Sequence, residues 1–237
     1  MKSLIGAAAA ASIAAVMGWV PNPWEGEPKV DLSISKTEAL DMDVEHVERS
    51  SATGEKTGKY PLETAAASVT LHNDGELSAV IVEVRATFEE VRKISPCKPI
   101  GGDLAITGKY SYGVPSSVST GSTQTLPAQF EVKPRSGDTL AITFGPEDPI
   151  IHASPLWLYR VKLELRETHS ENFFPVDGEF SMASMPHTAW AFSDDACMRK
   201  MGDTVVNKFM AGKNEGGHVV SPSLRELHSK SRERSGQ

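Results

Sequence analysis

The sequence predicts a mainly β protein: an antiparallel β-sandwich that follows an N-terminal hydrophobic helix and precedes short C-terminal helices. Three observations lead to this prediction. Residues 4–20 carry no charge, residues 29–186 alternate between apolar and polar positions, and apolar residues after Pro186 recur at helical spacing. The predicted organisation is a leader with a Trp/Pro stalk at 1–28, a sandwich at 29–186, and a helical cap with a disordered tail at 187–237.

Composition narrows the classes of function before any motif is considered. The chain has 237 residues, with 24 Lys and Arg against 31 Asp and Glu, which gives a net charge of −7. An acidic chain lacks the basic surface that sequence-independent nucleic-acid binding requires, so no nucleic-acid partner is expected. Two cysteines are too few for a disulfide-dense scaffold or for a four-cysteine zinc site.

The uncharged N-terminal run indicates export. Lys2 precedes it, and Pro21 and Pro23 follow it. As a signal anchor the run is close to the shortest segment that crosses a bilayer. The residues that would form this membrane segment are Leu4, Ile5, Ile13, Val16, Met17, Trp19 and Val20. With Lys2 inside, the rest of the chain lies outside the cytoplasm.

Two other interpretations of the same run stay open. The run also fits a cleaved signal peptide, in which Ser12-Ile13-Ala14 supplies small residues at the cleavage spacing. A buried Ala-rich helix in a cytoplasmic protein is the third interpretation, although no polar residues alternate through the run as in a soluble amphipathic helix. The first two predict a single-pass cell-membrane protein with its C-terminal domain outside, or a secreted protein if the leader is cleaved.

The body shows the period of two that is typical of strands. In Ala79–Val91, alternate residues from Val80 to Phe88 are apolar, and charged or polar residues lie between them. In Leu156–Arg166, every second residue from Trp157 to Leu165 is apolar, and every second residue from Arg160 to Arg166 is charged. This alternation favours antiparallel sheets with one face in water.

Seven weaker runs and the turns between them complete the predicted sandwich. The runs are 30–34, 42–47, 67–71, 104–110, 129–132, 139–144 and 179–182. Turn residues such as Asn73-Asp74-Gly75 separate them. The polar stretches 48–63 and 113–125 are predicted to be long mobile loops, with a functional role as the alternative.

Two segments carry a resemblance to a known family. Pro28 to Leu32 resembles the entry strand of bacterial Ig-like surface modules of the CARDB (cell-adhesion-related) kind, and Ser68 to Gly75 with the strand after it resembles their hairpin. The resemblance covers residues 28–90 and implies an Ig-like fold with no catalytic motif. The whole layout is also similar to uncharacterised membrane-anchored proteins of actinobacteria.

After Pro186 the spacing predicts helices. Ser193 would cap a first helix whose stripe includes Cys197, Val205 and Phe209 and which stops at Gly212. A second helix would start at Ser221 or Ser223, with Glu226 completing a capping box with Ser223. The tail from Ser229 onward is predicted to be disordered. The helical part is interpreted as a packing cap, with recruitment of a partner as the alternative.

No constellation of residues identifies a reaction. An even pair of cysteines in an exported chain predicts a disulfide between Cys97 and Cys197, with two unrelated thiols as the alternative. The seven histidines show no metal-ligand spacing, and the paired acids Glu89-Glu90, Glu147-Asp148 and Asp194-Asp195 are interpreted as solvated residues at turn, cap or exposed positions. No metal, cofactor or catalytic residue is therefore predicted.

The predicted function is non-enzymatic. We expect a membrane-anchored extracytoplasmic protein that contacts the membrane through its N-terminal helix and serves interaction or scaffolding with a protein of the envelope. The alternative is an extracytoplasmic hydrolase whose site is assembled from dispersed histidines and acids.

Overall fold

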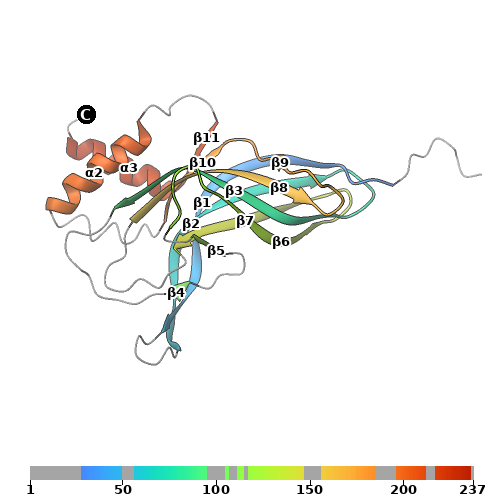
Figure 1. Cartoon of the computed structure of the whole chain (residues 1–237), viewed down its shortest axis with the longest axis horizontal. Coiled ribbons are helices and arrows are strands. Elements are labelled where there is room, and N and C mark those ends of the chain that lie inside the picture. Colours follow the sequence, from blue (N-terminus) through green and yellow to red (C-terminus); the bar gives the residue numbers. More distant parts are fainter. Residues whose placement is uncertain are drawn as a thin grey trace, which may run out of the picture.

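The computed structural model of the protein describes residues 28–49, 56–94, 105–106, 111–114, 117–146, 156–184, 196–211 and 217–235. These residues form two β-sheets and two short helices, so the predicted mainly β class is confirmed (Figure 1). The predicted N-terminal helix lies outside the described residues. Within the described residues, neither helix is long and apolar enough to span a membrane.

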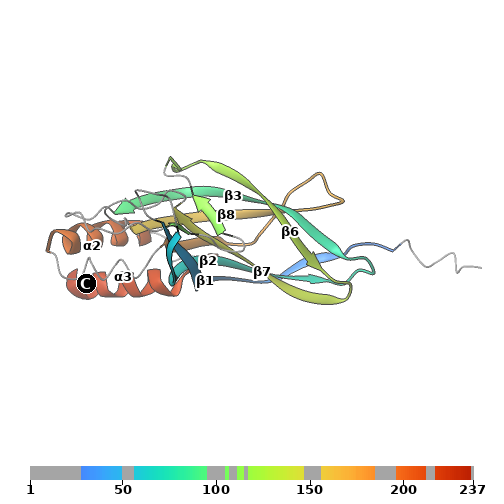
Figure 2. The ribbon, with the colours of Figure 1, turned by 90° about the horizontal axis from the view of Figure 1, so that it is seen from below.

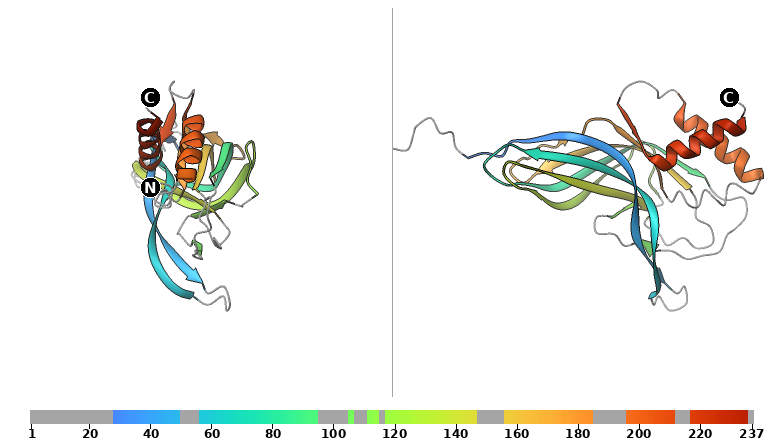
Figure 3. Two further views of the ribbon diagram at one scale, coloured as in Figure 1. Left: turned by 90° about the vertical axis from the view of Figure 1, so that its left-hand side faces the viewer. Right: turned by 180° about the vertical axis from the view of Figure 1, so that it is seen from behind.

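The first sheet has the strand order β4-β1-β2-β7-β5. Its strands are β1 (Leu32–Arg49), β2 (Lys56–Asn73), β4 (Ala105–Ile106), β5 (Ser111–Val114) and β7 (Ser136–Pro146). β1 and β2 pair antiparallel along their length, and the far half of this hairpin, where β4 pairs with β1, projects away from the body of the molecule (Figure 3). Most of the predicted loop 48–63 is therefore strand, and two predicted strands, 30–34 and 42–47, merge into β1.

The second sheet has the order β11-β10-β8-β3-β6, with β9 paired to β8 beside this row. Its strands are β3 (Ala79–Ile94), β6 (Thr123–Val132), β8 (Leu156–Glu167), β9 (Phe174–Pro175), β10 (Glu179–Ser184) and β11 (His218–Val220). The predicted loop 113–125 contains the end of β5 and the start of β6. Two pairings, β10 with β11 and β5 with β7, are parallel, so a wholly antiparallel fold is the wrong prediction.

The two sheets face each other across one apolar core (Figure 2). The alternation predicted for β8 is confirmed, because Trp157, Tyr159, Val161, Leu163 and Leu165 all belong to this core. Phe88 of β3 and Phe144 of β7 meet edge to face, with ring centroids 6.2 Å apart. Such contacts between the sheets hold the two layers together.

A β-bulge in β3 changes which residues enter the core. Ile81 pairs with Glu167 and Glu83 pairs with Arg166, so Val82 is an extra residue in the ladder. Ala79 and Ile81 are fully buried, while Val80 is only partly buried. The alternation predicted for this strand therefore holds beyond the bulge and is inverted before it.

The Asn73-Asp74-Gly75 turn carries the chain from the first sheet to the second. The Asn73 side chain is fully buried, accepts from the Gly75 amide at 3.1 Å and donates to the Leu77 carbonyl at 2.8 Å. A Cβ at Gly75 would lie 2.2 Å from the Lys29 carbonyl oxygen, so only glycine fits this close approach. β2 and β3 do not pair, which differs from the hairpin expected from the family resemblance.

Helices α2 (Ala196–Met210) and α3 (Pro222–Ser235) cover one end of the outer face of the second sheet. Their apolar residues form a second, smaller core with outward-facing sheet residues; this core is Ile94, Leu156, Leu158, Ala183, Val206, Phe209 and Leu224. The prediction of a helical cap agrees with this packing. The predicted N-cap Ser193 and stop Gly212 lie outside the described residues.

α3 begins at one of the two predicted starts, but its capping and its end differ from the sequence prediction. Ser221 is the N-cap residue, because its Oγ accepts from the Leu224 amide at 3.3 Å. Glu226 forms an i,i+4 ion pair with Lys230 instead of a capping box. The helix continues past Ser229 to Ser235, where disorder was predicted, and the buried Ser231 ties it to the Asp203 carbonyl of α2 at 3.2 Å.

Candidate functional site

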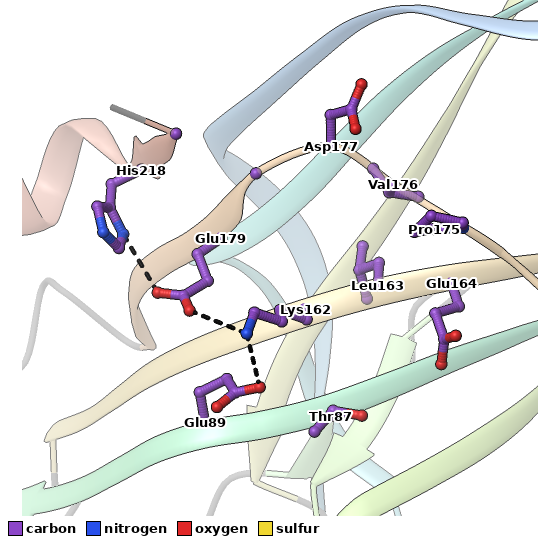
Figure 4. A pocket seen from close by; sticks show the side chains of 12 residues that line it. Thr87, Glu89, Lys162, Leu163, Glu164, Pro175, Val176, Asp177, Glu179 and His218 are labelled. Carbon is purple, nitrogen blue, oxygen red and sulfur yellow. Dashed lines mark ion pairs between the residues drawn. The ribbon is translucent and has the colours of Figure 1, made fainter. Parts of the chain in front are cut away.

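The candidate site is a cleft on the outer face of the second sheet, next to the part that the helices cover (Figure 4). Its volume is about 510 Å³. β8 supplies Lys162, which is 53% exposed, from the same outward-facing row as the buried Leu158 and Arg160. The row therefore changes from apolar to charged where the helical cover ends.

A second bulge in β3 places two adjacent carboxylates at this boundary. Phe88 pairs with Val161 and Glu90 pairs with Arg160, so Glu89 is the extra residue. A bulge breaks the strict alternation of side chains. As a result Glu89 contacts Lys162, with its Oε1 3.0 Å from Nζ, while Glu90 contacts Arg160.

These two glutamates differ from their sequence interpretation. They are predicted to be solvated residues at turn, cap or exposed positions, and the predicted strand Ala79–Val91 does contain them. Both instead form ion pairs, and the Glu90 side chain is only 18% exposed. The sequence carried one signal of this arrangement. Two consecutive charged residues interrupt an otherwise alternating strand, which is compatible with a bulge but does not by itself predict one.

Lys162 is held between two carboxylates. Its Nζ lies 3.0 Å from Glu89 and 3.4 Å from Glu179, the first residue of β10 (Figure 4). The hydrogen bond and charge of Glu89, with a smaller contribution from Glu179, raise the pKa of Lys162 above its ordinary value. Lys162 is therefore a fixed positive charge at neutral pH.

His218 of β11 completes the group. Its Nδ1 lies 3.3 Å from Glu179 Oε2, and its side chain is 17% exposed. The parallel pairing of β11 with β10 sets this contact, since Glu179 and His218 are register partners. Glu179 thus connects the ammonium of Lys162 with the imidazole of His218.

Arg160 connects the cleft with the helical cap. Its side chain is 4% exposed, and its Nη2 donates to the Phe209 carbonyl at 2.5 Å. This carbonyl lies in the last turn of α2, where backbone acceptors lack helical partners. The guanidinium also lies 4.5 Å from the centre of the Phe209 ring and donates to Glu90. Arg160 is therefore the polar attachment of α2 to the sheet.

Two glycines form the rim of the cleft. Gly178 has a φ of +94°, and a Cβ there would lie 2.9 Å from the carbonyl oxygen of Gly217, whose own φ is +101°. The Glu179 amide donates to that same carbonyl at 2.8 Å. This tight crossing brings β10 and β11 together and so positions Glu179 and His218.

The predicted disulfide and the predicted membrane segment involve residues that the structure does not describe or describes only in part. Cys97 lies outside the described residues, and only the backbone of Cys197 is described, in the first turn of α2. The disulfide between them therefore stays a prediction. The whole predicted membrane segment also lies outside the described residues.

The histidines do not gather in the part of the chain that the structure describes. The ones with described side chains lie in separate places: His72 beside Asp74 at 3.2 Å, His169 after β8, His218 in the cleft and His228 on α3. Burial lowers the pKa of His228, and the charge of Arg232 adds to this. No group of three His, Cys, Asp or Glu among the described residues is arranged to hold a metal ion.

Comparison of the chain with protein-family models, with curated proteins and with solved structures finds no match in any of the three. The arguments about function therefore rest on the geometry of the chain itself.

Proposed function

We propose that the protein is a non-enzymatic, membrane-anchored extracytoplasmic protein whose Ig-like sandwich engages a protein partner at the cell envelope through the outer cleft. The observation that carries the proposal is the placement of Lys162 between Glu89 and Glu179, at 3.0 and 3.4 Å. These groups form an array of opposite charges in which Lys162 and Glu89 reach solvent, while Glu179 is 15% exposed. Such an array recognises a complementary charged surface and sets its orientation.

The electrostatics of Lys162 favour binding over catalysis. A lysine that acts as a base or nucleophile has a lowered pKa, which burial or a neighbouring cation produces. Here the neighbouring carboxylates raise the pKa of Lys162 instead. The group is suited to holding a charge in place, which is what recognition needs.

The end at which the chain enters the body is consistent with a membrane anchor that leaves the outer cleft accessible to a partner. The start of β1, in blue, lies at the end of the body farthest from α2 and α3 (Figure 1). An anchor that precedes Pro28 would join the body at that end. The helices and the neighbouring cleft would then face away from the membrane, where an envelope protein can reach them.

Site-specific photo-crosslinking of the full-length protein in its host cells tests this proposal. A photoreactive residue at Asp177, on the rim of the cleft, should give a discrete protein adduct, whereas one at the exposed Asp138 of β7 should not. Lys162→Glu should weaken the Asp177 adduct by about tenfold or more. Lys133→Glu makes the same charge change at an exposed turn and should leave the adduct unchanged.

Three results would contradict the proposal. They are the absence of an adduct from Asp177, equal adducts from both positions, and an adduct that Lys162→Glu leaves unaffected.

One observation favours the alternative, an extracytoplasmic hydrolase. Glu179 Oε2 lies 3.3 Å from His218 Nδ1 without a hydrogen bond between these two atoms, and a carboxylate beside an imidazole is a common feature of a general base. Among the described residues that line the cleft, the hydroxyl side chain is Thr87, whose Oγ1 is 3.1 Å from Thr123 Oγ1. Turnover of a chromogenic ester, phosphate or glycoside that His218→Ala abolishes would support the hydrolase.

A further inference from the structure

A second cleft lies at the opposite end of the molecule, where the two sheets open next to the start of β1. Its volume is about 560 Å³. Five apolar side chains from separate segments form its walls: Pro28, Val30, Leu32, Leu77 and Phe174. Leu77 is 45% exposed and is the one large apolar side chain that is exposed among the described residues. The walls can therefore receive an apolar group of the size of a small molecule.

A buried carboxylate faces this cleft. Glu167 is the last residue of β8 and follows the alternation of Leu163 and Leu165, which places its side chain on the inner face between the sheets. The residue is 8% exposed and lines the cleft. The alternation of β8 thus places the carboxylate of Glu167 in the inward-facing row, where the other residues are apolar.

One oxygen of this carboxylate has no partner in the described part of the chain. Glu167 Oε2 accepts from the His169 amide at 2.8 Å, whereas Oε1 is buried and has no hydrogen bond. No described Lys, Arg or His lies within ion-pair distance of Glu167, and Lys29, which lines the same cleft, points instead to Asp31 at 3.9 Å. A buried carboxylate without a counter-charge is costly, because desolvation is not offset by an ion pair.

We propose that this cleft binds a small organic ammonium ion with an aliphatic body. The ammonium donates to Glu167 Oε1 and supplies the missing positive charge. The aliphatic body packs against Val30, Leu32 and Leu77, and the Phe174 ring adds a face on which organic cations are favoured. The cleft is separate from the one that we propose for the envelope partner, so the two proposals can fail independently.

Calorimetric titration of the purified full-length protein tests this inference, with titration into buffer as the reference. Hexylammonium should bind at least about tenfold more tightly than 1-hexanol, which has the same body without the charge, and hexanoate should not bind. Equal binding of hexylammonium and hexanol would overturn the proposal, since it would reveal an apolar patch alone.

Variants at the carboxylate and at the wall sharpen the test. Glu167→Gln keeps an acceptor for the His169 amide and should weaken hexylammonium binding by about tenfold or more. Glu171→Gln makes the same charge change at an exposed residue of the next turn and should have no effect. Leu77→Lys places a tethered ammonium at the mouth of the cleft and should also abolish binding, whereas Leu77→Met should retain it. Unchanged binding in Glu167→Gln or in Leu77→Lys would contradict the proposal.

Discussion

The outer face of the second sheet has a covered half and an open half, and both belong to one row of β8 side chains. In the covered half, Leu156 and Leu158 pack beneath α2 and α3. In the open half, Lys162 and the charged residues after it form ion pairs near solvent. Arg160 lies between the halves and belongs by sequence to the charged row, yet its side chain is only 4% exposed. A charged residue at such a boundary can therefore attach a helix instead of facing water.

The largest expected effect comes from breaking this boundary. Arg160→Met should lower the free energy of unfolding by about 3 kcal/mol or more, because Glu90 and the Phe209 carbonyl lose their buried partner. Urea denaturation of the purified protein, followed by tryptophan fluorescence, measures this loss. Lys162→Met removes a charge from the open half and should cost less than about 1 kcal/mol. Equal losses in the two variants would show that the halves do not differ.

The rim of the open half should be the next most sensitive position. Gly178→Ala places a Cβ 2.9 Å from the Gly217 carbonyl oxygen at a positive φ, so we expect a loss of about 1–3 kcal/mol. Gly202 in α2 has nothing within 4 Å of a Cβ. Gly202→Ala should therefore stabilise the covered half by up to about 1 kcal/mol. The midpoints of urea unfolding for the two variants should move in opposite directions.

The attachment of α3 to the covered half gives a smaller effect. Asp41 of β1 accepts from the Ser223 amide and hydroxyl, both at 2.7 Å, at the positive end of the helix dipole. Asp41→Ala should lower the free energy of unfolding by about 1–2 kcal/mol. Asp43→Ala, at an exposed position on the same strand, is the matched control. A loss of the same size in both variants would show that the hydrogen bonds of Asp41 to Ser223 do not stabilise the start of α3.

The smallest effect is expected far into the open half and should depend on pH. Arg166 donates to Glu83 through two nitrogens, each at 2.9 Å, and this hydrogen bonding and charge lower the pKa of Glu83 below 4.5. A carboxyl with a lowered pKa stabilises the folded state above its unfolded pKa and loses this contribution as the pH falls through the folded value. The stability difference between the wild type and Glu83→Gln should therefore be present at pH 7 and vanish in acid. A difference that persists or grows in acid would contradict this assignment.

The sequence predicted the faces of the second sheet better than the position of the helices that cover it. Alternation identified the inner and outer faces of β8 correctly because one face is buried along its whole length. It grouped Arg160 with Lys162, since both occupy the same phase of the alternation. The unbroken apolar run Leu156–Tyr159 was the signal that this end is buried on both faces, which is where the helices dock.

Other differences also have local causes. The two bulges in β3 depend on pairing with β8, which a strand pattern taken alone does not contain. The long hairpin of β1 and β2 was predicted as a loop over 48–63. That part of the hairpin projects away from the body of the molecule (Figure 3), and its sequence shows no period of two that would predict strands. The cleft joins Glu89, Lys162, Glu179 and His218 from four strands, and their proximity follows from strand order, not from spacing along the chain.

The proposed function depends most on the location of the body, which fractionation with intact-mass measurement of the full-length protein tests directly. We expect the protein in the membrane fraction, or outside the cell with the leader removed, and we expect the body to be digested when protease is added to spheroplasts. A non-reducing mass two hydrogen atoms lower than the reduced mass would also reveal a bond between Cys97 and Cys197. Recovery of the protein in the cytosol, with an intact leader and protected from external protease, would contradict the account.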